Sequence, residues 1–482
     1  MIQMSYSDGL YFNSLCEQLC QSIKTGKELH TAADRIRNQA DRIRKKADGY
    51  WSLPKGRLSF LQALEALASV LDHHATVSTI QMLKREFTQV LFKVNPRCRV
   101  LFLAQEVSVW PSLQGVYETM SADPRFETRL VYVPFIHPNQ KEADNNFSRY
   151  QKMGLPVQAH TDYSLTEDNP DIVFFAKPYD QIPEEFYITE IERIVEKTVY
   201  IPYGMETNYN LVRYGFQDYL HYRIWRHIVY GEFVKSVGAQ WGYRNGENIV
   251  VWGHPRMDYY RSGCHPEIPS GWSDKIRGKR VICWCPHHTI LPGPERVSTW
   301  MENHETVFEQ IRQHPDLALL WRPHPMLFGA LVNNGYMRAD EVETFIAEKT
   351  AEDNIILDQS EDYHAAFEVS DALITDGTTF SMEYLGTGKP LMLTISDITQ
   401  YYNHEEAEKG LYVAQNPADI VAFIEDVVCG QKDYKKAARQ EYARKMLFMP
   451  ENMSIAQHIT ECIFRDIRED QIQIARNMVQ WK

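Results

Sequence analysis

Several features that would assign this chain to a specialised class are missing from its sequence. No apolar run approaches the roughly 18 residues that a membrane-spanning helix needs, and the first segment, MIQMSYSDGLYFNSL, lacks the basic-then-apolar order of a signal peptide. The eight cysteines are scattered and none forms a C-x-x-C pair, so neither a zinc site nor a redox centre is indicated. We therefore expect a cytoplasmic protein with reduced thiols.

Basic residues are also fewer than acidic ones. The chain has 51 lysine and arginine residues against 64 acidic ones, which gives a formal charge of −13 at pH 7. Because nucleic-acid binding needs a clustered basic surface, this balance argues against a general nucleic-acid binder and leaves only a local basic site. No Asp-x-Asp motif occurs, and we expect neither a bound metal ion nor a cofactor.

The N-terminal part of the sequence is helical in pattern. The 482 residues exceed one ordinary hydrophobic core, and residues 1–95 contain helical stretches such as RLSFLQALEALASVLDHH. A short repeat, ADRIRNQ followed by ADRIRKK, places Ile36 and Ile43 one heptad apart among basic side chains. This pattern indicates either a solvated amphipathic helix or a contact with a partner or an anionic membrane surface.

Short apolar runs separated by helical segments begin near Arg97 and appear in two sets. The first set is RVLFLA, TRLVYVPF, DIVFFAKP and KTVYIPYG, and the second is NIVVWGHP, KRVICWCPHH, LALLWRPHP, NIILDQ and DALITDG. Such runs are typical of parallel strands that are buried on both faces. We predict two Rossmann-like, doubly wound α/β domains over residues 96–245 and 246–482, with ligands in an interdomain cleft beyond the carboxyl ends of the strands.

Polar donors follow four strands of the second set. They are Gly253-His254-Pro255-Arg256, Pro286-His287-His288, Arg322-Pro323-His324 and Asp376-Gly377-Thr378-Thr379. Imidazole, guanidinium and hydroxyl groups at one sheet edge predict a phosphate site. The alternative for each segment is a structural turn or a histidine of the core. Adjacent histidines on a strand would face opposite ways, so we expect at most one of His287 and His288 to line the cleft.

The stretch SDALITDGTTFSMEYLGTGKP, residues 370–390, predicts a strand, a turn and a helix start. Backbone N–H groups at the start of a helix can hold a pyrophosphate without a metal ion. Glu383, about one turn into the helix, can accept the hydroxyls of a ribose. The alternative is an ordinary N-cap at Thr378 or Thr379 and a solvated Glu383.

The same stretch, with LLWRPHP and VVWGHPRMD, resembles the motifs of the CDP-glycerol glycerophosphotransferase, or teichoic acid polymerase-like, family over roughly residues 199–463. The resemblance implies a GT-B fold. It also implies transfer of a phospho-polyol, most simply glycerol phosphate, from a CDP-linked donor to a hydroxyl of a cell-surface glycan or a lipid-linked acceptor. The donor-binding residues predicted on this basis are Arg256, His287, Arg322, Asp376, Gly377, Thr378, Thr379 and Glu383.

One departure from the family pattern concerns the catalytic base. In IPYGMET, Tyr203 stands where the family has a histidine, and a tyrosine with a pKa of about 10 is a poor base at neutral pH. We predict that Glu206, His287 or His288 supplies the base, and the predicted catalytic residues are His324, His288 and Glu206.

The alternatives are a GT-B glycosyltransferase that uses a nucleotide sugar in polysaccharide synthesis, and a catalytically silent nucleotide-binding partner of such a pathway. A peripheral contact with the inner face of the membrane is a further expectation.

Overall fold

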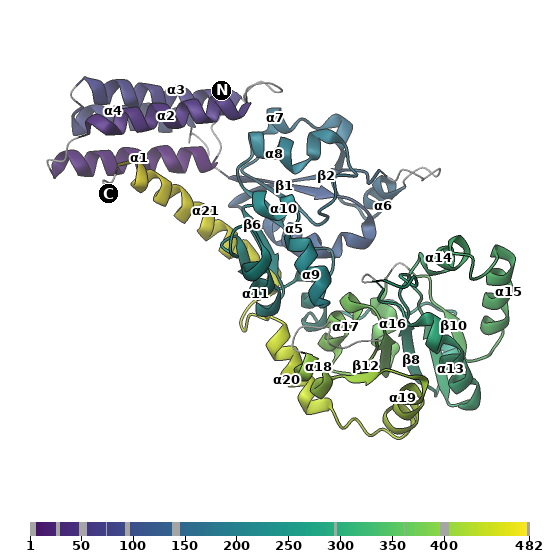
Figure 1. The fold of residues 1–482 in the computed structure, drawn as a ribbon. Coiled ribbons are helices and arrows are strands. Elements are labelled where there is room, and N and C mark those ends of the chain that lie inside the picture. Colours follow the sequence, from purple (N-terminus) through teal and green to yellow (C-terminus); the bar gives the residue numbers. More distant parts are fainter. Residues whose placement is uncertain are drawn as a thin grey trace. The chain divides into compact units, whose positions relative to one another are not determined.

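The structure is a computed structural model in which the chain forms helices around two parallel sheets (Figure 1). It describes residues 6–25, 29–47, 55–73, 75–91, 97–136, 145–293, 296–360, 362–395 and 404–479. The chain divides into two compact units. Unit 1 comprises Met1–Tyr203, Tyr219–Ile228 and Pro450–Lys482, and unit 2 comprises Gly204–Asp218 and Val229–Met449. The domain limits predicted from the sequence stay a prediction, and the two units do not coincide with them.

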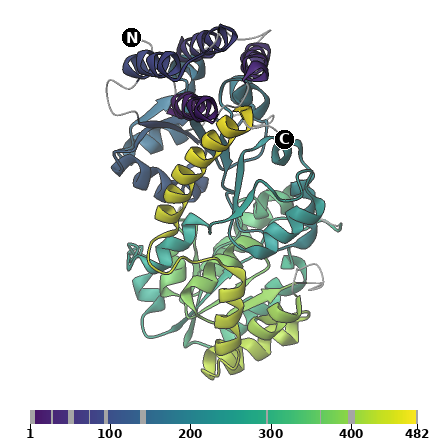
Figure 2. The ribbon, with the colours of Figure 1, turned by 90° about the vertical axis from the view of Figure 1, so that its left-hand side faces the viewer.

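Helices precede the first sheet, as the sequence predicts, and they form a bundle with the C-terminal helix. Its members are α1 (Tyr6–Lys24), α2 (His30–Ala47), α3 (Lys55–Asp72), α4 (Val77–Leu91) and the C-terminal helix α21 (Ile455–Val479). Figure 2 shows α21, in yellow, reaching α1, against which it packs. Within the described residues, no helix combines the length and the apolar character needed to span a bilayer.

The repeat on α2 uses its apolar side inside this bundle. Ile36 and Ile43 are buried in a core to which α1, α3, α4 and α21 also contribute. The basic side chains beside them pair with acids of α3, Arg37 with Asp72 and Arg44 with Glu65. The helix is therefore amphipathic, with its apolar face in the bundle core.

The first sheet has seven parallel strands. Its members are β1 (Cys98–Ala104), β2 (Phe126–Tyr132), β3 (Val157–Ala159), β4 (Ile172–Phe175), β5 (Thr198–Tyr200), β6 (Arg226–Val229) and β7 (Ile249–Val251), in the order β3-β2-β1-β4-β5-β6-β7. The sequence predicts that β7 opens the second set. Strand β7 belongs to unit 2, but it pairs as the last strand of the first sheet. Three apolar residues do not encode which sheet a strand joins.

The second sheet lies in unit 2 and has six parallel strands. Its members are β8 (Arg280–Cys285), β9 (Leu317–Trp321), β10 (Ile355–Leu357), β11 (Ala372–Thr375), β12 (Leu391–Thr394) and β13 (Tyr412–Ala414), in the order β10-β9-β8-β11-β12-β13. Its core includes the stacked rings of Trp284 and Trp300, whose centroids are 5.1 Å apart, and Trp321. These side chains hold β8 and β9 against the first turn of the helix α13 (Trp300–Gln313).

The remaining helical elements connect the strands. In and beside the first sheet they are η1 (Val107–Val109), α5 (Pro111–Ala122), α6 (Asn146–Lys152), η2 (His160–Asp162), α7 (Leu165–Asp168), η3 (Glu184–Phe186), α8 (Ile188–Ile194), α9 (Tyr209–Phe216), α10 (Tyr219–Arg223) and α11 (Glu232–Trp241). Beyond β7 they are η4 (Pro255–Arg261), α12 (Ser273–Ile276), α13 (Trp300–Gln313), α14 (Leu327–Asn333), α15 (Ala339–Thr350), α16 (His364–Val369), α17 (Thr378–Tyr384), η5 (Leu385–Thr387), α18 (His404–Gly410), α19 (Pro417–Ala422), η7 (Phe423–Cys429) and α20 (Lys436–Met446).

Candidate functional site

Three imidazoles meet at the carboxyl edge of the second sheet. Strands β8 and β9 are neighbours, so the segments that follow them emerge side by side. Ring centroids lie 4.3 Å apart for His287 and His288, 4.1 Å for His288 and His324, and 5.1 Å for His287 and His324. The two adjacent histidines both contact His324, because β8 ends at Cys285 and the alternation of a strand ends with it.

Burial keeps these imidazoles uncharged at neutral pH. It lowers the pKa of His287 to about 3 and that of His324 to about 4, with smaller contributions from neighbouring imidazoles. It also lowers the pKa of His288. A buried imidazolium would have to give up its hydration, so the neutral form is favoured. The cluster therefore offers uncharged nitrogen donors and acceptors.

The backbone selects the tautomer of two of these rings. The N–H of Met326 donates to Nδ1 of His324 at 3.2 Å. Nδ1 of His287 accepts from the N–H of Thr289 at 3.3 Å and lies 2.9 Å from the hydroxyl of the same residue. When Nδ1 of a neutral imidazole accepts, Nε2 carries the proton. Both rings then present an N–H donor, which suits an anionic oxygen.

The same three imidazoles are a set that could hold a metal ion, since their ligand nitrogens lie within 4.8 Å of one another. The sequence does not reveal this set, because His324 is far along the chain from the other two. Metal coordination through Nε2 requires that Nδ1 carry the proton. The backbone donors to Nδ1 oppose that tautomer and favour an anion, and metal independence stays a prediction.

Asp376 positions the histidine-bearing segment after β8. Its carboxylate is buried and accepts from the N–H of His287 at 2.6 Å and from the N–H of Thr299 at 2.8 Å. Burial raises the pKa of Asp376 to about 7, although these hydrogen bonds oppose the shift. Asp376 therefore ties the ends of β8 and β11 to the start of α13.

The predicted phosphate turn begins α17. Gly377 is the N-cap residue, and its N–H donates to Oγ1 of Thr375 at 2.9 Å. Oγ1 of Thr379 lies only 2.6 Å from the place where a Cβ on Gly204 would stand, so a side chain at position 204 would displace it. The side chain of Thr378 lies outside the described residues.

Arg322 is held by the segment that follows β10. Its guanidinium donates to Asp358 at 2.6 Å and to the hydroxyl and the carbonyl of Ser360 at 3.1 Å and 2.8 Å. The Arg322 side chain is 13% exposed. Its predicted role in phosphate binding stays a prediction, and in this structure Arg322 braces the ends of β9 and β10.

Glu383 and Arg256, both predicted to bind the donor, form a buried ion pair. The side chain of Glu383 is fully buried, and its Oε1 lies 3.2 Å from Nη1 of Arg256. Its Oε2 accepts from the hydroxyl of Tyr363, whose pKa burial raises well above its usual value. Each carboxylate oxygen thus has a partner within the protein, and ribose binding by Glu383 stays a prediction. No sequence signal points to Tyr363.

Glu206, a predicted base, and Tyr203, which stands where the family has a histidine, lie on the segment after β5. Oε1 of Glu206 accepts from the N–H groups of Thr207 and Asn208 at 2.8 Å and 2.7 Å, which braces the turn before α9. Tyr203 belongs to unit 1, and its hydroxyl lies 2.9 Å from that of Tyr179. The identity of the base stays a prediction.

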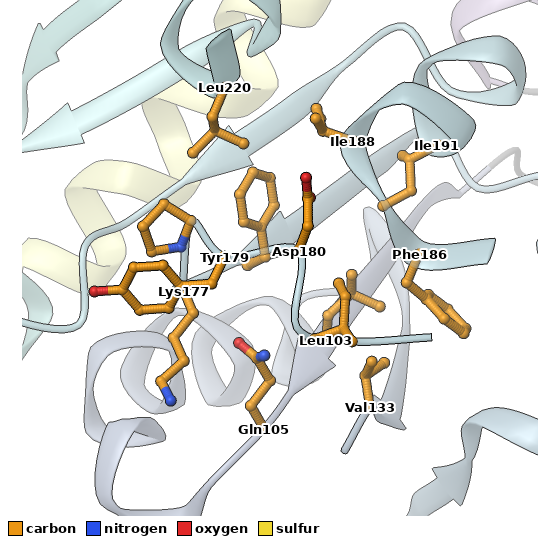
Figure 3. Close-up of a pocket in the computed structure, with 13 residues that line it drawn as sticks. Leu103, Gln105, Val133, Lys177, Tyr179, Asp180, Phe186, Ile188, Ile191 and Leu220 are labelled. Atoms are coloured by element: carbon orange, nitrogen blue, oxygen red, sulfur yellow. The ribbon is translucent and has the colours of Figure 1, made fainter. Parts of the chain in front are cut away.

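A pocket opens at the carboxyl edge of the first sheet, within unit 1 (Figure 3). About 410 Å³ of space that protein atoms do not fill lies in and in front of it, open solvent included. The residues after β4, Lys177 to Asp180, form much of its rim. The motif DIVFFAKP contains the first two of these residues, but the sequence alone gives no reason to expect a pocket there.

Comparisons with known proteins agree with this architecture. Residues 242–457 match the model of the family described as CDP-glycerol:poly(glycerophosphate) glycerophosphotransferase. A solved structure described as an S. aureus MnaA-UDP co-structure has a TM-score of 0.51 and 15% identity, over 77% of this chain and 96% of that one. A putative UDP-N-acetylglucosamine 2-epimerase from Listeria monocytogenes has a TM-score of 0.51 and 13% identity, over 77% of this chain and 97% of that one. These two show the fold and confirm the predicted GT-B class.

The wall teichoic acid polymerase TagF is also similar, with a TM-score of 0.48 and 14% identity over 86% of this chain and 98% of that one. No curated protein sequence matches the chain.

Proposed function

Because residues 242–457 match the model of the CDP-glycerol:poly(glycerophosphate) glycerophosphotransferase family, we propose that this protein is an enzyme that transfers a phospho-polyol from a CDP-linked donor. Glycerol phosphate is the simplest group to transfer, and the acceptor is a hydroxyl of a cell-surface glycan or of a lipid-linked precursor. The TagF structures include one described with CDPG. The reaction would take place in the cytoplasm, at the inner face of the membrane when the acceptor is lipid-linked.

The imidazole cluster is the observation that supports the donor half of this proposal. The imidazoles of His287 and His324, each of which would present an Nε2–H donor, lie together at the carboxyl edge of the second sheet, where ligands of open α/β sheets bind. In the partly dehydrated site, two such donors would stabilise negative charge on the donor phosphates. Asp376 holds the backbone of His287, and the N–H of His324 donates to Pro286 at 2.9 Å, so the donors are fixed before the substrate binds.

A protein catalyses phosphoryl transfer mainly by positioning the reactants and by stabilising the charge on the phosphate oxygens. The acceptor oxygen attacks the phosphorus of the glycerol phosphate, and CMP leaves with the electron pair of the broken P–O bond. His324 and His287 would donate to the phosphate oxygens on which charge develops, and a base would take the proton of the acceptor hydroxyl. Of the three predicted bases, Glu206 and His288 remain, because His287 acts here as a donor.

The test is product analysis. Purified protein would be incubated with CDP-glycerol or CDP-ribitol and a short synthetic saccharide or lipid-linked acceptor, and the products identified by mass spectrometry. We expect CMP and an acceptor that is heavier by one phospho-polyol group. Transfer of a sugar from a UDP- or GDP-linked donor would support the glycosyltransferase alternative, and absence of any turnover despite CDP binding would support a silent partner.

A further inference from the structure

The pocket of unit 1 lies where the order of strands reverses. Strand β1 has β2 on one side and β4 on the other, and the chain leaves these strands at the carboxyl edge of the sheet. Open α/β sheets leave a crevice at such a point. The floor is apolar and is formed mainly by Leu103, Val133, Phe175, Ile182, Ile188 and Leu220. Figure 3 shows Gln105, Lys177, Tyr179 and Asp180 around this floor.

The charged groups at the rim are already balanced. Among the described residues that line the pocket, Lys177 is the only cation. Its ammonium pairs with Glu106 and lies 4.0 Å from the ring centroid of Phe135. The carboxylate of Asp180 accepts a hydrogen bond from the hydroxyl of Tyr219. A chain of glycerol phosphates would need cations to neutralise it, and this rim offers no surplus of them.

Two tyrosines add exposed aromatic surface beside the rim. Tyr179 is 41% exposed and Tyr203 is 38% exposed, their hydroxyls are 2.9 Å apart, and their ring centroids are 6.3 Å apart. A tyrosine combines an apolar face with a polar edge. A saccharide ring has the complementary surface, because its C–H groups form apolar faces and its hydroxyls lie around the edge.

One buried oxygen near the pocket has no partner. Oε2 of Glu106 is buried and accepts no hydrogen bond from any described residue. Glu106 directly follows the pocket residue Gln105, and its other oxygen pairs with Lys177. Unsatisfied buried acceptors are rare in folded proteins and call for an explanation. A hydroxyl group of a bound ligand would supply the missing donor once the side chain of Glu106, which does not itself line the pocket, turns toward it.

We propose that unit 1 binds the acceptor as a neutral saccharide. A sugar ring lies against Tyr179 and Tyr203, and its hydroxyls reach the carboxylates of Glu106 and Asp180. This inference rests on the proposed function, because it names the chemical class of the acceptor in that transfer. It places recognition of the acceptor on aromatic and carboxylate groups instead of on a basic surface.

The experiment measures acceptor binding without turnover. Chitobiose, cellobiose and lactose serve as neutral probes and a glycerol phosphate trimer as the anionic probe, with saturation-transfer NMR on the full chain in the absence of donor. We expect at least one neutral disaccharide to bind and the trimer to bind more weakly. Tyr179→Ala should weaken disaccharide binding roughly three- to tenfold, the range expected for the loss of one aromatic contact.

Two further variants keep the result interpretable. Glu106→Gln should also weaken disaccharide binding, whereas Tyr434→Ala, which removes a tyrosine of unit 2 that is 73% exposed, should leave it unchanged. Stabilisation of each variant by CDP, measured by thermal shift, reports separately on folding and on the donor site. The inference is overturned if no disaccharide binds, if the trimer binds more tightly, or if Tyr179→Ala binds as the parent does. If saccharide binding fails but the protein binds CDP, only this inference is overturned and the proposed function stands. If the protein does not bind CDP, the result counts against the proposed function.

Discussion

Arg256 and Glu383 stand 127 residues apart in the chain and form an ion pair of 3.2 Å that is almost wholly buried. Tyr363 completes the set by donating to the second carboxylate oxygen. Charges buried in this way are tolerated because each has a partner, and removal of one partner leaves the other as an uncompensated charge. The pair therefore joins η4 to α17 beside the predicted phosphate turn, and its integrity should control both folding and donor binding.

Glu383→Ala should lower the free energy of unfolding by roughly 3–5 kcal/mol, because Arg256 would be left buried without a counter-charge. Glu383→Gln should cost less, since the amide oxygen still accepts a hydrogen bond. Urea unfolding of both variants measures this, and isothermal titration with CDP shows whether donor affinity falls as well. Equal stability of Glu383→Ala and the parent would contradict the structural role.

His324→Ala should reduce turnover far more than it reduces affinity for CDP. A donor that acts on charge developing in the transition state contributes chiefly to the rate, and loss of one such donor typically costs about 10²–10³ in kcat. Steady-state kinetics with CDP-glycerol, combined with CDP titration, separates the two effects. His265→Ala is the matched control, because His265 has a largely exposed side chain paired with Glu368. A variant at His324 with normal turnover would remove this residue from the mechanism.

Catalysis should persist in EDTA. The tautomer imposed by Met326 and Thr289 on the imidazole cluster favours an anion over a cation, and the N–H donors can stabilise the phosphates directly. The measurement is CMP release with and without EDTA, followed by metal analysis of the purified protein. Loss of activity that zinc or magnesium restores would instead assign the three histidines a metal ion.

The buried imidazoles should make folding sensitive to acid. The pKa of His324 is about 6.5 in the unfolded chain but about 4 in the folded protein. The unfolded state therefore gains protons first, and stability is lost as the pH falls from about 6.5 toward 4. Asp376 acts in the opposite direction, because its folded pKa of about 7 exceeds its unfolded value.

A comparison of variants isolates the histidine contribution to this pH dependence. Between pH 7 and pH 5, the change in the free energy of unfolding of His324→Asn should differ from that of the parent by about 1–2 kcal/mol, with the parent losing more. Urea unfolding at the two pH values provides the numbers. Parallel profiles for parent and variant would show that His324 is not held neutral by burial.

Local pattern was enough to predict much of the architecture. A parallel strand buried on both faces needs a continuous apolar run, and nine such runs, from RVLFLA to DALITDG, each contain a strand. The strands β3, β6, β12 and β13 were not among these runs. The helical bundle was equally visible, because Ile36 and Ile43 repeat with the period of a helix face.

The sequence by itself therefore determined the two α/β sheets, the helical N-terminal region and the family motifs around His324 and Glu383. Only the tertiary structure decided which of these residues meet. His288 and His324 come together because β8 and β9 are neighbours in the sheet, and Arg256 reaches Glu383 from a segment that follows a strand of the other sheet. Strand order and the burial of charge depend on contacts between segments far apart in the chain, which local periodicity does not encode.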